Sequence, residues 1–177
     1  DETTRAAVRA LAAEGDVLLE KGDYSAALDR FRRAAALIAA PTVRLREATC
    51  LEKLGKWIEA ADLYRKVSRT ELKPGDPASF RQATEQAATQ AVALDAKIPK
   101  LVFALSGSDL AGATIEVDGQ AVPSAVWATG WPVNPGKHRV VASKGDRTTE
   151  SNAEVKEAEK LQVTLVLRET AAPPIAA

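Results

Sequence analysis

The first half of the sequence repeats itself, and this repetition constrains the fold more than any other feature. A shift of 33 residues superimposes five pairs of similar side chains: Leu18 on Leu51, Gly22 on Gly55, Tyr24 on Trp57, Ala27 on Ala60, and Phe31 on Tyr64. In each copy the glycine can end a helix in a left-handed conformation, and the alanine lets two helices approach closely. Such a unit buries its apolar face only by stacking on a neighbour. The first half therefore predicts stacked helix–turn–helix units.

This pattern resembles the tetratricopeptide repeat, a helix–turn–helix unit of about 34 residues. The matching residues of the first unit are Gly15, Leu18, Gly22, Tyr24, Ala27, Phe31 and Ala34. Those of the second unit are Ala48, Leu51, Gly55, Trp57, Ala60 and Tyr64. The resemblance implies two such units in series.

A further helix is expected after the second unit, in place of a third copy. Asp76 followed by Pro77 predicts its N-cap and first turn, and Pro99 predicts its end close to Lys97. Its apolar residues recur at helical spacing on one face: Phe80, Ala83, Ala87, Ala91, Leu94 and Ile98. This face would cover the open end of the second unit, so we expect five helices in all.

The hydrophobic period changes near residue 98, which predicts a boundary between two domains. From there Leu101, Phe103 and Leu105 alternate with other residues, as strands do, while Asp118-Gly119 predicts a tight hairpin. We therefore expect an α+β protein with two domains. Its parts are a helical repeat domain over residues 1–98, a small antiparallel β-sandwich over 99–169, and a Pro/Ala linker or tail over 170–177.

Two segments of the second half, residues 112–119 and 132–138, resemble the PEGA-like β-module. The tetrapeptide that gives this module its name is absent, and His138 stands where the Pro-Gly-x-aromatic step usually has tyrosine. Tetratricopeptide units followed by such a module are similar to a class of bacterial cell-envelope proteins, often tethered by a downstream membrane helix. The resemblance implies a periplasmic or envelope location, with a membrane anchor outside this sequence allowed.

Composition and motifs exclude several classes of function. The 24 basic and 24 acidic residues balance, which gives no footprint for nucleic acid. One Cys and one His cannot supply a zinc site or a disulfide, and no phosphate-binding loop or hydrolase motif is present. No apolar stretch approaches the roughly 20 residues that span a bilayer. We expect no enzyme, no cofactor, no metal and no membrane insertion.

The sequence contains no methionine, so its first residue, Asp1, is not a retained translation start. We therefore expect a chain that has been processed or excised from a longer one.

The resemblance to tetratricopeptide proteins also implies where a partner docks, because the first helix of each unit lines a concave groove there. The implied groove positions are Arg9, Ala12, Asp16, Leu19 and Glu20, then Leu45, Arg46, Thr49, Glu52 and Lys53. The expected function is a non-enzymatic scaffold that docks a protein partner in this groove, with the β-domain as spacer or second docking site.

Chaperone-tail binding is not expected. Members of the family that bind such tails hold a terminal carboxylate with a Lys/Asn/Lys/Arg clamp. Here Asp16 stands at the clamp asparagine, Ala12 at the nearby lysine, and only Arg46 matches. An acidic side chain at this position would repel the carboxylate.

The alternative function is a glycan- or peptidoglycan-associated module that uses Trp127 and Trp131. Exposed tryptophans can stack on sugars, whereas in a small domain they can equally fill the core. For Cys50 and His138 we expect packing roles, as a small core hydrophobe and as a cover for the core edge.

Overall fold

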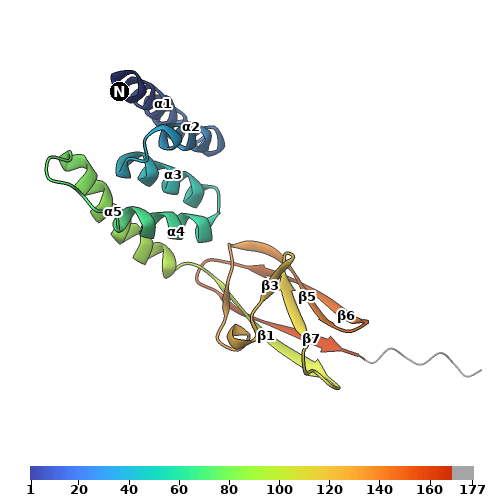
Figure 1. The fold of residues 1–177 in the computed structure, drawn as a ribbon. Helices are drawn as coiled ribbons and strands as arrows, with labels where there is room; N and C mark the ends of the chain where they lie inside the picture. The colour runs from blue at the N-terminus through green and yellow to red at the C-terminus, as the bar shows by residue number, and fades with distance from the viewer. Residues whose placement is uncertain (169–177) are drawn as a thin grey trace, which may run out of the picture. The chain divides into compact units, whose positions relative to one another are not determined.

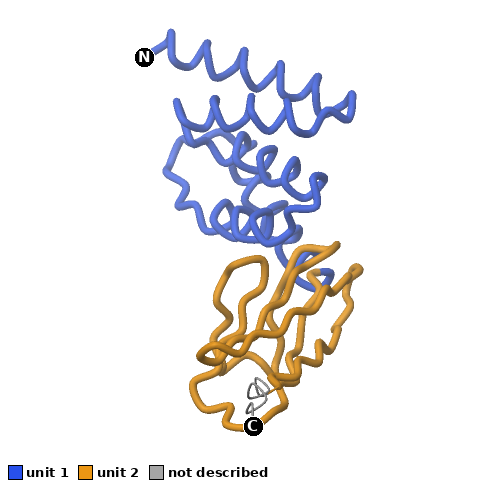
Figure 2. Tube along the Cα trace, turned by 90° about the vertical axis from the view of Figure 1, so that its right-hand side faces the viewer, with its two compact units in different colours: residues 1–97 blue, residues 98–177 orange. Residues whose placement is uncertain are grey.

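The computed structural model describes residues 1–168, so the expected linker or tail over 170–177 lies outside the described residues. The fold is α+β: five helices in the N-terminal part are followed by two sheets, one of three strands and one of four (Figure 1). The chain divides into two compact units, residues 1–97 and the residues from 98 onwards (Figure 2). Each unit is described by itself below.

The first unit is a stack of helices in which each helix packs against the next along the chain, and α3 also contacts α5. The helices are α1 (Glu2–Glu20), α2 (Tyr24–Leu37), α3 (Pro41–Lys53), α4 (Trp57–Ser68) and α5 (Ala78–Asp95).

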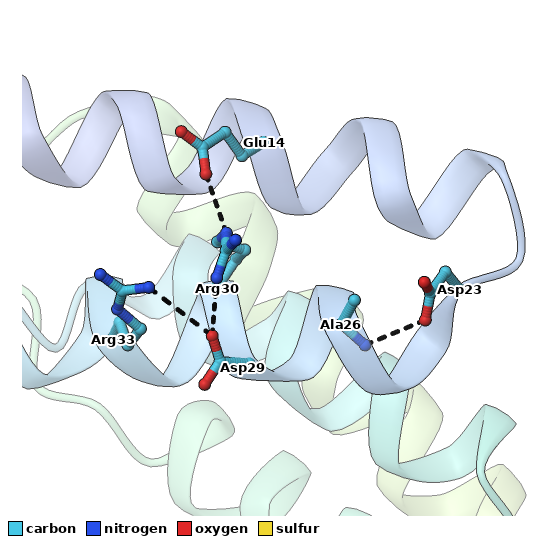
Figure 3. Close-up of polar contacts among 6 residues, drawn as sticks. All are labelled: Glu14, Asp23, Ala26, Asp29, Arg30 and Arg33. Carbon is cyan, nitrogen blue, oxygen red and sulfur yellow. Dashed lines mark hydrogen bonds and ion pairs between the residues drawn. The ribbon is translucent and has the colours of Figure 1, made fainter.

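The two repeat copies turn in the same way. Gly22 and Gly55 have φ values of 79° and 74°, which a side chain would strain, so the predicted left-handed positions are confirmed. The residue after each glycine donates its N–H back to the preceding helix at 3.0 Å, Asp23 to the Leu18 carbonyl and Lys56 to the Leu51 carbonyl. Asp23 then caps α2 by accepting the Ala26 N–H, as Figure 3 shows. Equivalent sequence thus produces equivalent turns.

The helices meet closely at the small residues of the repeat. Ala27, Ala60 and Phe31 are fully buried, with no exposed surface. A Cβ added at Gly15 would lie 2.7 Å from Cζ of Phe31, well inside van der Waals contact. Because close-packed interiors tolerate little extra volume, the separation of α1 and α2 depends on these residues.

The arginines of α2 have carboxylate partners. Arg30 donates to Glu14 of α1 at 2.8 Å and to Asp29 at 2.7 Å (Figure 3). Arg32 donates to Glu47 of α3 at 3.4 Å. Arg30 and Arg32 therefore connect α2 to the helices on both sides of it.

The start of α5 differs from the prediction. Asp76 is not the N-cap, since α5 begins at Ala78 and its N-cap is Pro77. The Asp76 carboxylate instead accepts the Lys73 N–H at 2.7 Å, within the preceding turn. Short acidic side chains often bond nearby backbone in this way, in competition with capping. The predicted apolar face is otherwise buried at Ala83, Ala87, Ala91 and Leu94.

The second unit contains two sheets, with strand orders β4-β1-β7 and β3-β2-β5-β6. The strands are β1 (Lys100–Gly107), β2 (Thr114–Val117), β3 (Gln120–Val122), β4 (Trp131–Pro132), β5 (Gly136–Lys144), β6 (Arg147–Val155) and β7 (Lys160–Leu167), with a short 3-10 helix at Ser124–Val126. One hydrophobic cluster draws on both sheets. Its most enclosed side chains include Leu101, Ile115, Val140, Leu165 and Leu167.

The expectation of a wholly antiparallel domain is wrong for one ladder. β1 and β7 pair in parallel over their whole length, from Lys100 opposite Lys160 to Gly107 opposite Leu167. A parallel pair needs a long connection, and here β2 to β6 supply it. The predicted hairpin is confirmed: Asp118 and Gly119 join β2 to β3 with φ values of 51° and 80°.

We predict that Ala27→Trp and Ala60→Trp each lower the free energy of unfolding of the helical unit by about 1–3 kcal/mol or more, because neither site has room for an indole. Chemical denaturation followed by circular dichroism measures this. Ala88→Trp is the matched control, since Ala88 lies exposed on α5. A denaturation midpoint equal to that of the parent in both core variants would disprove the close approach at these alanines.

Candidate functional site

Two of the predicted groove residues bind each other across the helix stack. Arg46 of α3 lies with Nε 3.2 Å from Oδ1 of Asp16 of α1. Both side chains are about half exposed, at 53% and 44%. Asp16, which stands where the clamp has asparagine, is thus neutralised by Arg46, the one residue that matches the clamp. This part of the surface offers a charge pair rather than a free guanidinium.

Two other predicted groove residues bind the second helix of their own repeat. The Tyr64 hydroxyl of α4 donates to Glu52 Oε2 at 2.9 Å and lies 3.3 Å from Thr49 Oγ1, which itself donates to the Leu45 carbonyl at 3.0 Å. Burial and the neighbouring Glu52 carboxylate raise the pKa of Tyr64 above its ordinary value. These contacts fasten α4 to α3. Of the remaining positions, Glu20 and Lys53 are exposed, and Leu19 is half-buried.

Sites for small ligands are hollows of about 300–1,000 Å³. The helical unit has one of ≈ 630 Å³ where the N-terminal parts of α1, α3 and α5 come together. We call it the α1/α3/α5 hollow. It is lined by Arg5, Val8, Arg9, Ala12, Ile38, Ala40, Thr42, Val43, Pro77, Ser79 and Phe80. Arg9 and Ala12 are the groove positions from the sequence that contribute to it.

The lining of this hollow is mostly apolar. Val8 and Val43 are buried, with 9% and 6% of their surface exposed, and Ile38 beside them is 37% exposed. Phe80 is only half-buried, although helical periodicity places it with the core face of α5. Pro41 at the first position of α3 favours the start of the helix there. Its neighbours Ala40, Thr42 and Val43 line the hollow. The hollow therefore leaves apolar side chains partly exposed.

Sequence reasoning missed Ile38 and Phe80 as site residues. The signal was present: Phe80 lies in the first turn of its helix, where the neighbouring repeat covers it incompletely. Ile38 follows the last residue of α2, in the connection to α3. Large apolar side chains at helix ends are candidates for a surface patch as much as for the core.

In the second unit, the two candidate tryptophans pack against the core. Both are half-buried and contact the hydrophobic cluster. The Trp127 indole N–H donates to the Val122 carbonyl at 3.0 Å, and Trp131 pairs with Leu101 in the β4–β1 ladder. Each indole thus stabilises the unit, and only part of its surface is left for a ligand.

Cys50 is a buried side chain of α3, as expected for a small core hydrophobe. Burial raises the pKa of its thiol to about 11, and the nearby Glu47 carboxylate adds to this rise. Because the thiolate is the reactive form, Cys50 is a protonated and unreactive thiol near neutral pH.

His138 joins three segments of the second unit. Its Nδ1 lies 2.6 Å from Asp118 Oδ2 in the β2–β3 turn, and its Nε2 lies 2.7 Å from the Asn134 carbonyl before β5. Asp118 also accepts the Arg139 N–H at 2.8 Å. Burial raises the pKa of the Asp118 carboxyl, but the hydrogen bonds from His138 and from Arg139 outweigh it, so that this pKa lies below its ordinary value.

A shallow hollow of ≈ 540 Å³ lies beside this histidine, lined by residues of both signs of charge: Asp118, Lys137, His138, Arg139, Asn152, Ala153 and Glu154. The basic groups Lys137 and Arg139 lie on β5, the acidic groups are Glu154 of β6 and Asp118 of the β2–β3 turn, and the ring nitrogens of His138 are already engaged. This surface has no single sign of charge, and Ala153 is the one apolar residue in its lining, in contrast to the α1/α3/α5 hollow.

Residues 1–168 contain no group of three or more His, Cys, Asp and Glu side chains that could hold a metal ion. Within the same residues, no helix combines the length and the apolar character that a membrane span requires. Comparison with models of protein families, with curated proteins and with solved structures gave no match for this chain. The geometry of the two units is therefore the basis for inferring a function.

The contacts of Asp118 predict how acid destabilises the second unit. Its folded-state pKa is lowered, so its carboxylate contributes stability above the unfolded pKa, and this contribution is lost as the pH falls through the folded pKa. Asp118→Asn should melt below the parent at neutral pH, and its melting temperature should fall less between neutral pH and about pH 3, near the ordinary carboxyl pKa. Thermal melts across this pH range test the prediction.

Glu116→Gln is the control for this prediction, because Glu116 is another exposed carboxylate next to the same hairpin. Equal acid sensitivity in Asp118→Asn and the parent would mean that the contacts of the Asp118 carboxylate with His138 and the Arg139 N–H do not contribute to stability.

Proposed function

We propose that this chain is a non-enzymatic protein–protein interaction scaffold whose partner docks in the α1/α3/α5 hollow. The observation that carries the proposal is the exposed apolar wall of this hollow, formed by Ile38 and Phe80 over a floor of Val8 and Val43. Apolar side chains gathered in a surface concavity favour binding, since contact with a partner removes them from water. Three different helices form this concavity, as expected for the inner face of a repeat array.

We assign the helical unit to the tetratricopeptide type, with α1–α2 and α3–α4 as its two repeats and α5 as a capping helix. The matched turns at Gly22 and Gly55 support this assignment, as do the buried alanines at positions 27 and 60. The hollow then belongs to the groove formed by the first helices of the repeats and by the capping helix.

We assign the second unit to a small β-sandwich of the PEGA-like kind, which acts as spacer or second docking site. A single hydrophobic cluster shared by the two sheets supports a sandwich. A location in the bacterial periplasm or cell envelope, with a membrane anchor elsewhere in the full-length protein, follows from the resemblance alone. The buried, protonated thiol of Cys50 fits a role without nucleophilic catalysis.

The glycan-binding alternative takes second place. It depends on Trp127 and Trp131, and sugar stacking needs a broad exposed aromatic face. Both indoles are half-buried against the core instead. The exposed apolar area of the helical unit therefore gives docking of a protein the stronger support.

The proposal predicts site-specific cross-linking from the hollow. A photo-reactive phenylalanine analogue placed at Ser79 should cross-link a partner protein in the envelope fraction of the source cells, and adding Phe80→Glu should remove the cross-link. The same analogue at Ala88, on the exposed side of α5, is the matched control and should give none. Mass spectrometry identifies the product, and circular dichroism confirms that the Phe80→Glu chain remains folded.

Two results would count against docking in the hollow. One is a cross-link at Ser79 that persists in the Phe80→Glu chain. The other is loss of the partner in a chain with Arg46→Glu and Lys53→Glu while Phe80→Glu retains it, which would move docking to the other end of α3. Loss of binding only on substitution of Trp127 and Trp131 would favour the glycan alternative.

A further inference from the structure

The charged side chains that line the α1/α3/α5 hollow are all of one sign. Of the eleven residues that line it, Arg5 and Arg9 are the charged ones, and no lining residue is a carboxylate. They lie one helical turn apart on α1, so both point to the same side of the helix. Their side chains are 69% and 66% exposed. The hollow thus combines an apolar wall with a positively charged rim.

One carboxylate of the chain itself already binds this rim. Glu2 Oε1 accepts a hydrogen bond from Arg9 at 2.5 Å, and Glu2 Oε2 lies 4.0 Å from Arg5. The hydrogen bond from Arg9 holds the pKa of Glu2 below its ordinary range. Glu2 is itself 72% exposed, so it can leave the guanidinium groups without breaking any packing. Unlike the one-to-one pair of Arg46 with Asp16, one carboxylate here serves two guanidinium groups and lies close only to Arg9, so the rim keeps an excess of positive charge that a further carboxylate can bind.

We propose that the α1/α3/α5 hollow binds an acidic amphipathic segment of a partner protein, with apolar side chains against Phe80 and Ile38 and a carboxylate on Arg5 and Arg9. The proposal rests on the proposed function, which it deepens by naming the chemistry of the partner. The incoming carboxylate replaces Glu2, which makes Glu2 an internal competitor. A basic segment would meet like charge at the rim.

The test selects peptides without assuming a partner. A displayed library of random linear peptides is panned against the full chain, and peptides that also bind Phe80→Glu are discarded. The peptides that remain should be rich in Asp and Glu beside large apolar residues. The best of these is then synthesised together with a version in which Gln and Asn replace its Glu and Asp, and both affinities are measured by fluorescence anisotropy at low and moderate salt.

The acidic peptide should bind about fivefold more tightly than its amide version at low salt, as expected for two exposed charge pairs. Added salt should reduce this difference. The double variant Arg5→Gln, Arg9→Gln should remove it, and Glu2→Gln should increase affinity for the acidic peptide. Arg33→Gln is the matched control: Arg33 is 60% exposed on α2, outside the hollow, and its loss should change neither affinity.

The failures of the two proposals are distinguishable. Peptides that need Phe80 but show no acidic preference, or that gain nothing from Glu2→Gln, overturn the acidic partner and leave docking in the hollow intact. If panning gives no peptide that depends on Phe80, both proposals fall. Self-association of the chain that Phe80→Glu abolishes, measured by sedimentation, would make a second copy the occupant. Peptide binding that tightens when residues 169–177 are removed would assign the hollow to the chain's own end.

Discussion

The close approach of neighbouring helices is the constraint on which the helical unit depends. It requires residues with little or no side chain where the helices touch: Gly15 against Phe31, and alanine at positions 27 and 60. The same contacts fix where the N-terminal parts of α1, α3 and α5 lie, and therefore where the hollow forms. Charge pairs such as Arg30 with Glu14 add orientation, but exposed pairs of this kind contribute little to stability. Packing of small residues thus determines both the fold of this unit and the position of the hollow.

Much of the fold could be predicted because local chemistry specifies it. The left-handed glycines and the Asp118-Gly119 turn follow from backbone conformations that few residues tolerate. The parallel pairing of β1 with β7 could not be predicted, since alternation of apolar residues shows which face is buried but not the direction of the neighbouring strand. Asp76 was ambiguous for another reason: the same carboxylate can cap a helix or close the turn before it, and tertiary context decides.

The candidate site was harder to predict than the fold. Thr49 and Glu52 have the right positions on their helix for a groove, yet the Tyr64 hydroxyl is hydrogen-bonded to both side chains. Nothing in the spacing of Thr49 and Glu52 shows these bonds between helices. Asp16 and Arg46 lie far apart in the sequence and neutralise each other. Phe80 matches the periodicity of the core residues but lies in the first turn of α5, where its side chain is only half-buried. Surface function depends on which groups remain unengaged, and that depends on the assembled helices.

The parallel pairing of β1 and β7 has a mechanical consequence. The chain enters the second unit at Lys100 and leaves it after Leu167, and these ends lie at opposite ends of the same two paired strands. At about 3.3 Å per residue, the pair separates entry from exit by roughly 23 Å along the strands. A pull between the two ends would act along the strands, so their hydrogen bonds would bear the load together rather than open one after another. A unit built this way resists stretching, which suits the spacer role that we propose for it.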